Sequence, residues 1–252
     1  MKLSIVIPAY NEEKRIKPTL NDYASFFSKK YGKNFEILVV LNGCKDKTLD
    51  VVRETSKKYP QIRYIDIKEK IGKGGAIIHG FRLSKGELIG YADADNATKV
   101  KAFNDLVEKI NGFDGIVASR WIKGAKINKK QPLTRRIASR IFNIFTRILF
   151  GIKTRDTQCG AKLFKKKPIE KVLNELGITQ WAFDIDLLYR LKKNGFKVLE
   201  IPTEWHDQKD SKLKIGKTSL EMFLAIIRLR LVYSPFKFIV IFYNKAYDLF
   251  VK

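Results

Sequence analysis

The first 120 residues alternate between short apolar runs and longer amphipathic segments. The apolar runs are rich in Ile and Val and have the length of β-strands, whereas the longer segments have the length of helices. The predicted strands are 3–7, 36–41, 62–67, 87–93 and 115–119. The predicted helices are 12–31, 46–59, 74–84 and 99–110. This alternation indicates an α/β fold with a mostly parallel sheet.

The pattern changes after residue 120, where residues 122–130 are polar and basic, and we expect a mobile loop there. Further elements are a helix rich in Ile and Phe over 133–152, a turn and short strand within 156–164, a helix over 181–195 and a last strand over 197–205. Two amphipathic helices with a break near Ser234 are predicted for the C-terminus. We therefore expect one α/β domain over residues 1–215, followed by C-terminal amphipathic helices over 216–252.

Polar clusters follow four of the predicted strands at the point where each strand ends. They are PAYNEE after the first strand, NGCKDKT after the second, IGKGG after the third and DADNAT after the fourth. Ligands of open parallel sheets bind beyond the carboxyl ends of the strands. The four clusters are therefore expected to line one cleft.

The DADN segment places Asp93 and Asp95 directly after a buried strand. In an extended chain the two side chains point the same way, roughly 7 Å apart, and they repel each other unless a cation lies beside them. Mg²⁺ and Mn²⁺ take such hard oxygen ligands, often together with substrate phosphates. A pair of solvated acids at the start of a loop is the alternative, since D-x-D is common. The position at a strand end, in a chain of charge +24, favours the divalent cation.

The glycine-rich segment that begins at Ile71 does not fit the common nucleotide-binding motifs. Ile77 stands where G-x-G-x-x-G requires glycine, and the Walker A pattern does not fit either. What remains is a glycine-rich entry to a helix, where backbone N–H groups and Lys73 can approach a ligand closely. A plain helix entry explains Gly75 equally well.

The charge of the chain is unusual, because 50 Lys and Arg against 26 Asp and Glu give +24. Such a charge attracts nucleic acid, an anionic membrane surface or phosphorylated substrates, although a lysine-rich surface can also serve solubility alone. The two cysteines, Cys44 and Cys159, lie far apart, which excludes a disulfide framework and indicates a cytoplasmic protein. The run after Met1 is too short for a signal peptide, and no window has the ~18–20 apolar residues of a membrane span.

Several segments, in order along the chain, resemble glycosyltransferases of family 2, which have the GT-A fold. SIVIPAYNEE at the N-terminus, DAD at 93–95 and ASR at 118–120 carry this resemblance. The segments DADNATK, DTQCGAKLF (156–164), WAFDIDLL (181–188) and the region from Trp205 to SKL (211–213) are similar to dolichyl-phosphate β-glucosyltransferases. The similarity extends from Met1 to about Leu213.

The resemblance implies an inverting transfer of a hexose to a polyprenyl or dolichyl phosphate. It favours glucose as the sugar and UDP-glucose as the nucleotide-sugar donor, with Mg²⁺ or Mn²⁺ as cofactor. Two alternatives keep the same fold: GDP-mannose as donor, or a glycan hydroxyl as acceptor with Asp184 as the general base. A remote alternative is a basic nucleic-acid-binding protein without catalysis. It explains the charge, but the acids of the DAD segment would repel the phosphates of a nucleic acid. We therefore expect no nucleic-acid partner.

The resemblance also implies roles for single residues. Asp95 would be the principal metal ligand, with Asn96 as a weaker candidate, and Asp93 would be shared between the metal and the ribose. Arg135 and Ser139 would orient the acceptor phosphate, and Asp184 would act as a base or position a sugar hydroxyl or an Arg. The residues implied in donor binding are Pro8, Tyr10, Glu12, Asn42, Asp46, Lys73, Gly74, Asp93, Arg120, Ser211 and Lys212. Asn42 replaces an acid that is common in the family, so the identity of the base stays open.

A lipid-phosphate acceptor would have to be met at a bilayer. Residues 133–152 and 223–250 both combine Ile and Phe with Arg or Lys, as interfacial helices do. The alternative is that these apolar faces close the core or a dimer interface. We expect a peripheral location on the cytoplasmic, inner face of the cell membrane, and the oligomeric state stays open.

Overall fold

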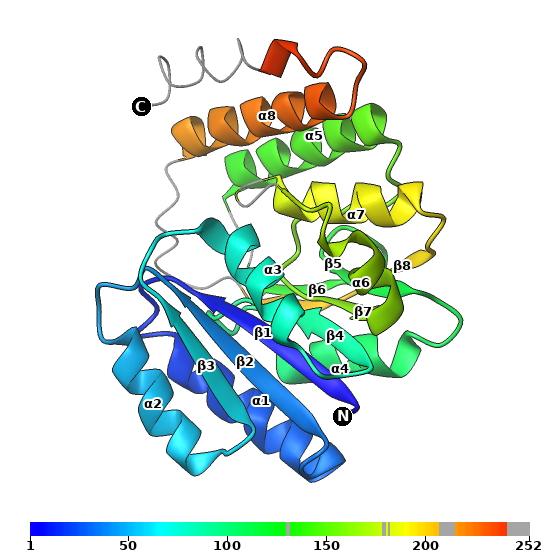
Figure 1. Ribbon diagram of the computed structural model, residues 1–252. Helices are drawn as coiled ribbons and strands as arrows, with labels where there is room; N and C mark the ends of the chain where they lie inside the picture. Colours follow the sequence, from blue (N-terminus) through cyan, green and yellow to red (C-terminus); the bar gives the residue numbers. More distant parts are fainter. Residues whose placement is uncertain (130–131, 178–179, 181, 207–214, 241–252) are drawn as a thin grey trace.

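The computed structural model of the chain describes all residues except 130–131, 178–179, 181, 207–214 and 241–252 (Figure 1). The strands are β1 (Leu3–Ala9), β2 (Phe35–Asn42), β3 (Ile62–Ile67), β4 (Leu88–Tyr91), β5 (Gly115–Ser119), β6 (Lys126–Lys129), β7 (Lys162–Lys165), β8 (Val198–Pro202) and β9 (Glu204–His206). The helices are α1 (Ile16–Tyr31), α2 (Thr48–Lys58), α3 (Gly72–Leu83), α4 (Val100–Lys109), α5 (Leu133–Phe150), α6 (Lys166–Leu173), α7 (Phe183–Lys193) and α8 (Ile215–Val232).

Among the described residues, seven strands form one sheet in the order β3-β2-β1-β4-β7-β5-β8. The neighbouring strands are parallel, except that β7 runs antiparallel to both β4 and β5. A smaller sheet pairs β6 with β9. The prediction of an α/β fold with a mostly parallel sheet is thus confirmed.

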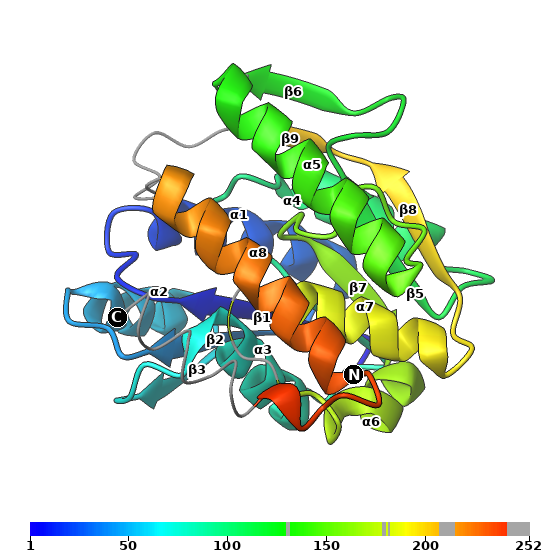
Figure 2. The same ribbon diagram turned by 90° about the horizontal axis from the view of Figure 1, so that it is seen from above.

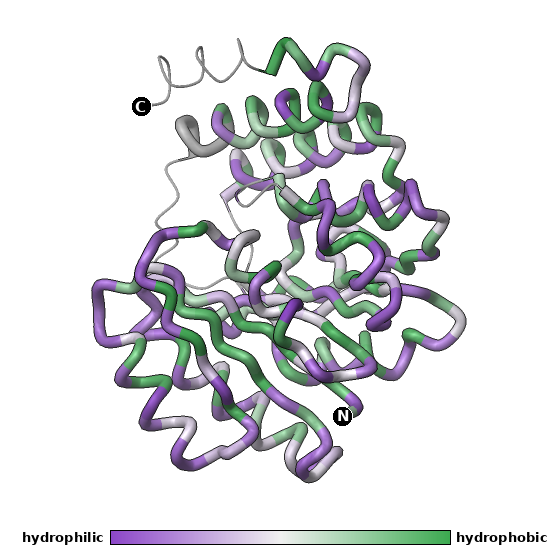
Figure 3. The backbone as a smooth tube through the Cα atoms, in the orientation of Figure 1, coloured by the Kyte–Doolittle hydropathy of each residue, from purple (hydrophilic) through white to green (hydrophobic). Residues whose placement is uncertain are grey.

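Helices cover both faces of the large sheet (Figure 1). One apolar cluster packs α1, α2 and α4 against the sheet, with aromatic rings such as Phe27 and Phe103 at its centre. A second cluster packs α3, α6 and α7 against the opposite face. Because both faces are covered, β1 and β2 are buried along their length, and Figure 3 shows them as nearly continuous apolar runs.

Two helices lie side by side in an outer layer beyond α7 (Figures 1 and 2). These are α5 and α8, and the rings of Phe145 and Phe223 meet edge to face at 5.6 Å between them. Ile226 and Leu229 of α8 are buried in the same apolar cluster as α7. The C-terminal helix is therefore part of the packed structure.

The predicted strands and helices of the first 120 residues are present, with ends shifted by a few residues. The predicted loop over 122–130 is wrong in part, because Lys126–Lys129 pairs with β9 as strand β6. The predicted single strand over 197–205 is also wrong. It breaks at Thr203, so that β8 pairs with β5 while β9 joins the small sheet. Helix α6 was not predicted.

The first of the two predicted C-terminal helices is present. Helix α8 ends at Val232, just before Ser234, and the second predicted amphipathic helix lies mostly outside the described residues. No described helix is both long enough and apolar enough to cross a bilayer.

Candidate active site

The polar clusters that follow β1 and β2 are joined at the carboxyl edge of the sheet. The backbone N–H of Glu12 donates to Oγ1 of Thr48 at 2.8 Å, and that of Glu13 donates to Oδ2 of Asp46 at 3.2 Å. Asp46 also accepts the backbone N–H of Thr48 at 3.0 Å, and these hydrogen bonds lower its pKa although its burial opposes the shift. The predicted convergence of these two clusters is therefore correct.

The cluster that follows β3 is fixed to the same edge by Asn42. The Oδ1 atom of Asn42 accepts the backbone N–H of Ile71 at 2.7 Å, directly before α3. An uncharged side chain suits this position, since a buried carboxylate would need further donors. Tyr10 lies at the exposed rim, with its side chain 40% exposed and the ammonium of Lys70 4.5 Å from its ring centroid. Pro8 lies within β1, opposite Val40 of β2.

Contrary to what the sequence pattern predicts, the chain does not stay extended through DADN. After β4 it turns at Ala94 and Asp95, and Asn96 has a φ of 58°, a left-handed conformation that Asn tolerates. Oδ1 of Asp95 accepts the backbone N–H of Ala97 at 3.0 Å. The side chain of Asn96 donates to Asp22 of α1 at 2.8 Å, so the amide is held on the helix side of the loop.

Three carboxylates influence one another at this edge. Burial and the neighbouring charge of Asp93 raise the pKa of Asp95. Burial also raises the pKa of Glu12, and the negative charges of Asp95 and Asp93 raise it further. The balancing cations are Lys73, 2.5 Å from Oδ1 of Asp93, and Arg15, 3.9 Å from Oδ2 of Asp95. Elevated pKa values of this kind indicate a place where added positive charge is favourable.

The donor set of this edge fits Mg²⁺ or Mn²⁺. Carboxylate oxygens of Asp93 and Asp95 are the hard ligands that these ions prefer. Within the described residues, no three His, Cys, Asp or Glu side chains are placed to hold a metal by themselves. An ion bound here would therefore take its remaining ligands from water and from substrate oxygens.

Lys73 connects the acids of the β4 loop with α7. Although burial opposes it, the charges of Asp93 and Asp184 raise the pKa of Lys73, so its ammonium stays charged. The adjacent Gly74 packs against α7, since a Cβ atom at position 74 would lie 2.6 Å from Cβ of Phe183. Gly74 thus permits the close approach of α3 to α7, a packing role that its sequence motif does not reveal.

Arg120, at the end of β5, is held by Asp156. Its Nε and Nη2 atoms donate to the two carboxylate oxygens at 2.8 and 2.9 Å, and its backbone N–H adds a third hydrogen bond at 2.9 Å. Although burial opposes it, the buried carboxylate raises the pKa of Arg120. The guanidinium carbon lies 5.3 Å from the ring centroid of Trp205. The group predicted to face a phosphate is therefore rigidly placed before any ligand binds.

The DTQCG segment passes directly beside Asp93. A Cβ atom at position 160 would lie 1.7 Å from Oδ2 of Asp93, so any side chain there would displace this carboxylate. The preceding Cys159 is buried, and burial, followed by the charge of Asp156, raises the pKa of its thiol to about 11. Cys159 is therefore a packed thiol and not a reactive one.

Asp184 lies in the first turn of α7 and is paired with a buried lysine. Lys162 donates to Oδ1 of Asp184 at 2.5 Å and to the carbonyl oxygen of Cys159 at 2.7 Å, and the hydroxyl of Tyr91 also donates to Asp184. Although burial opposes it, the charge of Lys162 lowers the pKa of Asp184. The sequence motifs did not single out Lys162 or Tyr91. A lysine within the apolar stretch AKLF is the signal that could have found the first.

The predicted acceptor residues Arg135 and Ser139 are half-buried on α5. Asn143 fixes this helix to the DTQCG segment, because its Oδ1 atom accepts both the N–H and the hydroxyl of Thr157 at 2.8 Å. In the part of the chain that the structure describes, no ion pair or hydrogen bond joins Arg135 to the acids of the β4 loop. The predicted donor residues Ser211 and Lys212 lie outside the described residues.

The outer helices present apolar side chains to the surface, with Ile148 the most exposed at 73%. We call this surface the α5–α8 face. Its exposed apolar residues are Leu133, Ile137, Ile141, Ile144, Phe145 and Ile148 of α5, Leu220, Phe223 and Val232 of α8, and Phe236, Phe238 and Ile239 beyond it. Arg136, Arg140 and Arg147 lie on the same helix α5.

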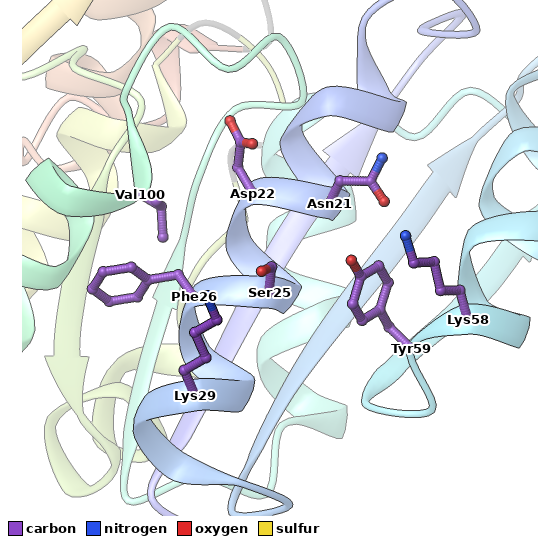
Figure 4. A pocket seen from close by; sticks show the side chains of 8 residues that line it. All are labelled: Asn21, Asp22, Ser25, Phe26, Lys29, Lys58, Tyr59 and Val100. Carbon is purple, nitrogen blue, oxygen red and sulfur yellow. The ribbon is translucent and has the colours of Figure 1, made fainter.

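A hollow of about 480 Å³ lies between α1, the end of α2 and the start of α4 (Figure 4). Its lining includes Asp22, Lys29, Lys58 and Tyr59. None of the predicted site residues lines it. The hollow touches the candidate site only through Asp22, which holds Asn96.

Comparisons with known proteins agree with this geometry. The family described as "Glycosyl transferase family 2" matches residues 4–173. The dolichyl-phosphate beta-glucosyltransferase of Dictyostelium discoideum is 34% identical over 243 residues, which cover 92% of this chain and 74% of the relative. The Saccharomyces cerevisiae protein of the same name is 32% identical over 251 residues, covering 92% of this chain and 75% of the relative.

A solved structure has a similar fold. It is glucosyl-3-phosphoglycerate synthase from Mycobacterium tuberculosis in complex with Mn²⁺, UDP and phosphoglyceric acid. It matches with a TM-score of 0.65 at 15% identity and covers 90% of this chain and 77% of the other. At this identity the likeness concerns the fold alone.

Proposed function

Because the chain belongs to glycosyl transferase family 2 and is a glycosyltransferase with the GT-A fold, we propose that it transfers a hexose from a nucleotide-sugar to a polyprenyl phosphate. Glucose is the favoured sugar, UDP-glucose the favoured donor and dolichyl phosphate the favoured type of acceptor, because relatives with 32–34% identity are named dolichyl-phosphate beta-glucosyltransferases.

The observation that supports the proposal best is the arrangement of charge at the carboxyl edge of the sheet. Asp93, Asp95 and Glu12 form a cluster of carboxylates there, and Lys73 and Arg15 lie beside it. A nucleotide diphosphate is strongly anionic, and this edge offers the side-chain cations Lys73 and Arg15 together with oxygen ligands for a divalent ion.

Mg²⁺ or Mn²⁺ would be held by Asp95 and Asp93, and when bound it would stabilise the charge of the departing diphosphate. On the donor side, Pro8, Tyr10, Glu12, Asn42 and Asp46 would surround the base and the ribose. Lys73, Gly74 and Arg120 would lie toward the diphosphate, and Ser211 and Lys212 would cover it.

Arg135 and Ser139 would orient the acceptor phosphate, whose oxygen attacks the anomeric carbon as the bond to the diphosphate breaks, with inversion. A phosphate acceptor is already anionic and needs no general base. We therefore assign Asp184 a positioning role, for which its pairing with Lys162 is suited.

The membrane is the source of such an acceptor, and the α5–α8 face is the surface proposed to contact it. Exposed Ile and Phe side chains together with Arg are the composition of an interfacial surface, and the chain's charge of +24 favours anionic lipid. Residues 1–215 would form the catalytic domain and 216–252 the membrane-interfacial part. The enzyme would act peripherally on the cytoplasmic face.

The test is transfer of radiolabelled sugar into lipid that organic solvent extracts. We expect label from UDP-glucose with dolichyl phosphate, in the presence of Mn²⁺ or Mg²⁺. Label transferred from GDP-mannose would show that GDP-mannose is the donor. Label found only in water-soluble glycans would show that the acceptor is a glycan and not a lipid phosphate. Absence of label from UDP-glucose, GDP-mannose and UDP-N-acetylglucosamine would overturn the proposal.

A further inference from the structure

Trp121 lies between two arginine side chains at the carboxyl edge of the sheet. It follows Arg120, the first residue after β5, and its ring centroid is 5.7 Å from the guanidinium carbon of Arg120 and 5.2 Å from that of Arg140. Arg140 belongs to α5 and is the neighbour of Ser139. The indole ring therefore bridges the strand end assigned to the donor and the helix assigned to the acceptor.

The indole nitrogen of Trp121 is buried and has no hydrogen-bond partner among the described residues. A buried N–H group without a partner is unfavourable, so native proteins rarely leave one unless a ligand or water satisfies it. The backbone N–H of Trp121 does have a partner, the hydroxyl of Ser119 at 3.2 Å. The missing partner thus concerns only the side chain, the part that differs between Trp and other aromatic residues.

The surroundings of this N–H indicate what it would bind. Arg120 is already neutralised by Asp156, whereas Arg140 is exposed and makes no ion pair with any described residue. An N–H donor beside an uncompensated guanidinium suits an anionic oxygen, and phosphate oxygens accept several such hydrogen bonds at once. A neutral sugar hydroxyl would not balance the positive charge of Arg140.

We propose that the indole N–H of Trp121 donates a hydrogen bond to a phosphate oxygen of the bound substrate, with Arg140 adding charge from the neighbouring helix. This assignment rests on the proposed function of the same site. The phosphate belongs either to the diphosphate of the donor or to the lipid phosphate of the acceptor. Trp121 lies between the two assigned regions, so the experiment separates these two sources.

Two substitutions distinguish the N–H group from the ring that bears it. Trp121→Phe keeps an aromatic ring between the arginines but removes the donor, whereas Trp121→His has a smaller ring that retains an N–H group. Binding is measured by calorimetry with UDP and Mn²⁺ in one arm and with a short-chain polyprenyl phosphate in detergent in the other. Transfer kinetics are measured in parallel, and thermal unfolding checks that each variant folds.

We expect Trp121→Phe to weaken the binding of one of the two ligands about tenfold or more, since a hydrogen bond to a charged group is lost. Its affinity for the other ligand should stay within about twofold. The ligand whose binding is weakened identifies which phosphate Trp121 contacts. The KM of the corresponding substrate should rise, whereas the KM of the other should not. Trp121→His should bind the affected ligand more tightly than Trp121→Phe does. If only the packing of the ring mattered, Trp121→Phe would bind more tightly than Trp121→His.

The inference is overturned if Trp121→Phe binds both ligands as the wild type does, or if Trp121→His is worse than Trp121→Phe in both arms. It is also overturned if the wild type binds neither ligand. Failure of the proposed function has a different signature. The wild type would then bind a phosphate ligand that Trp121→Phe binds less well, yet transfer no sugar to lipid.

Discussion

The ammonium nitrogen of Lys162 lies 2.5 Å from Oδ1 of Asp184, and the lysine side chain is 0% exposed. The same ammonium holds the carbonyl of Cys159, next to the glycine that touches Asp93. Lys162 therefore connects α7 with the loop that packs against the acids of the site. We therefore expect Lys162 to influence the reaction through these residues.

We expect Lys162→Met to lower the free energy of unfolding by roughly 3–5 kcal/mol, because it leaves a buried carboxylate without its partner. Urea denaturation measures this loss. The double variant Lys162→Met with Asp184→Leu removes both charges and should regain most of the stability. A single variant as stable as the wild type would show that the pair contributes nothing to the fold.

The stability of this pair should depend on pH in a defined direction. The pKa of Asp184 is lowered in the folded state, so the folded protein binds fewer protons than the unfolded chain, whose Asp pKa is about 3.9. The stabilisation is therefore complete above about pH 4 and is lost as the pH falls through the lowered pKa of Asp184. Urea denaturation between about pH 2 and 7 should show a steeper acid loss for the wild type than for Asp184→Asn. Parallel curves for the two proteins would contradict the assignment.

Gly160→Ala should impair catalysis more than stability. The added Cβ atom would lie 1.7 Å from Oδ2 of Asp93, so the carboxylate or the loop has to move. A misplacement of about 1 Å can cost roughly 100-fold in rate, and we expect a fall in kcat of at least about tenfold. Gly177→Ala is the matched control, because a Cβ atom at position 177 meets nothing within 4 Å. Equal activity of the two variants would remove Asp93 from the reacting geometry.

Asp95→Ala should abolish turnover while the fold remains intact. The substitution removes the principal ligand proposed for the divalent ion, and it also removes a carboxylate whose pKa is raised by burial and by Asp93. We expect the binding of UDP to lose its dependence on Mn²⁺ in calorimetry. Asp50→Ala, at an exposed position of α2, is the control. Turnover at the wild-type rate in Asp95→Ala would exclude the metal role.

Ile144→Glu combined with Ile148→Glu should weaken membrane binding, since it places two carboxylates on the α5–α8 face. Co-sedimentation with vesicles that contain anionic lipid measures the effect, and we expect the bound fraction to fall several-fold. Leu83→Glu, at the exposed end of α3, is the control. If all three proteins bind vesicles alike, the face is not the membrane contact. Sedimentation without lipid would then show whether it joins two copies of the chain.

The amino-acid pattern was enough to predict which segments of the first 120 residues are strands or helices, and the edge of the sheet at which their polar clusters meet. Both follow from local patterns: strands of a parallel sheet end at one edge, so residues such as Asp46 and Asp93 are placed there once the strands are recognised. Local patterns likewise predicted the two acids proposed to bind a metal, Asp93 and Asp95, and the helix α5.

Contacts between residues that are distant in the sequence became visible only in the folded chain. Strand β7 enters the sheet between β4 and β5 in the antiparallel sense, and no local pattern predicts that position. Its insertion brings Gly160 against Asp93 and Lys162 against Asp184. The physical reason is that hydrophobic periodicity indicates which face of a single segment is buried, but not which other segment covers it. A buried ion pair instead depends on two segments whose separation only the packed sheet fixes.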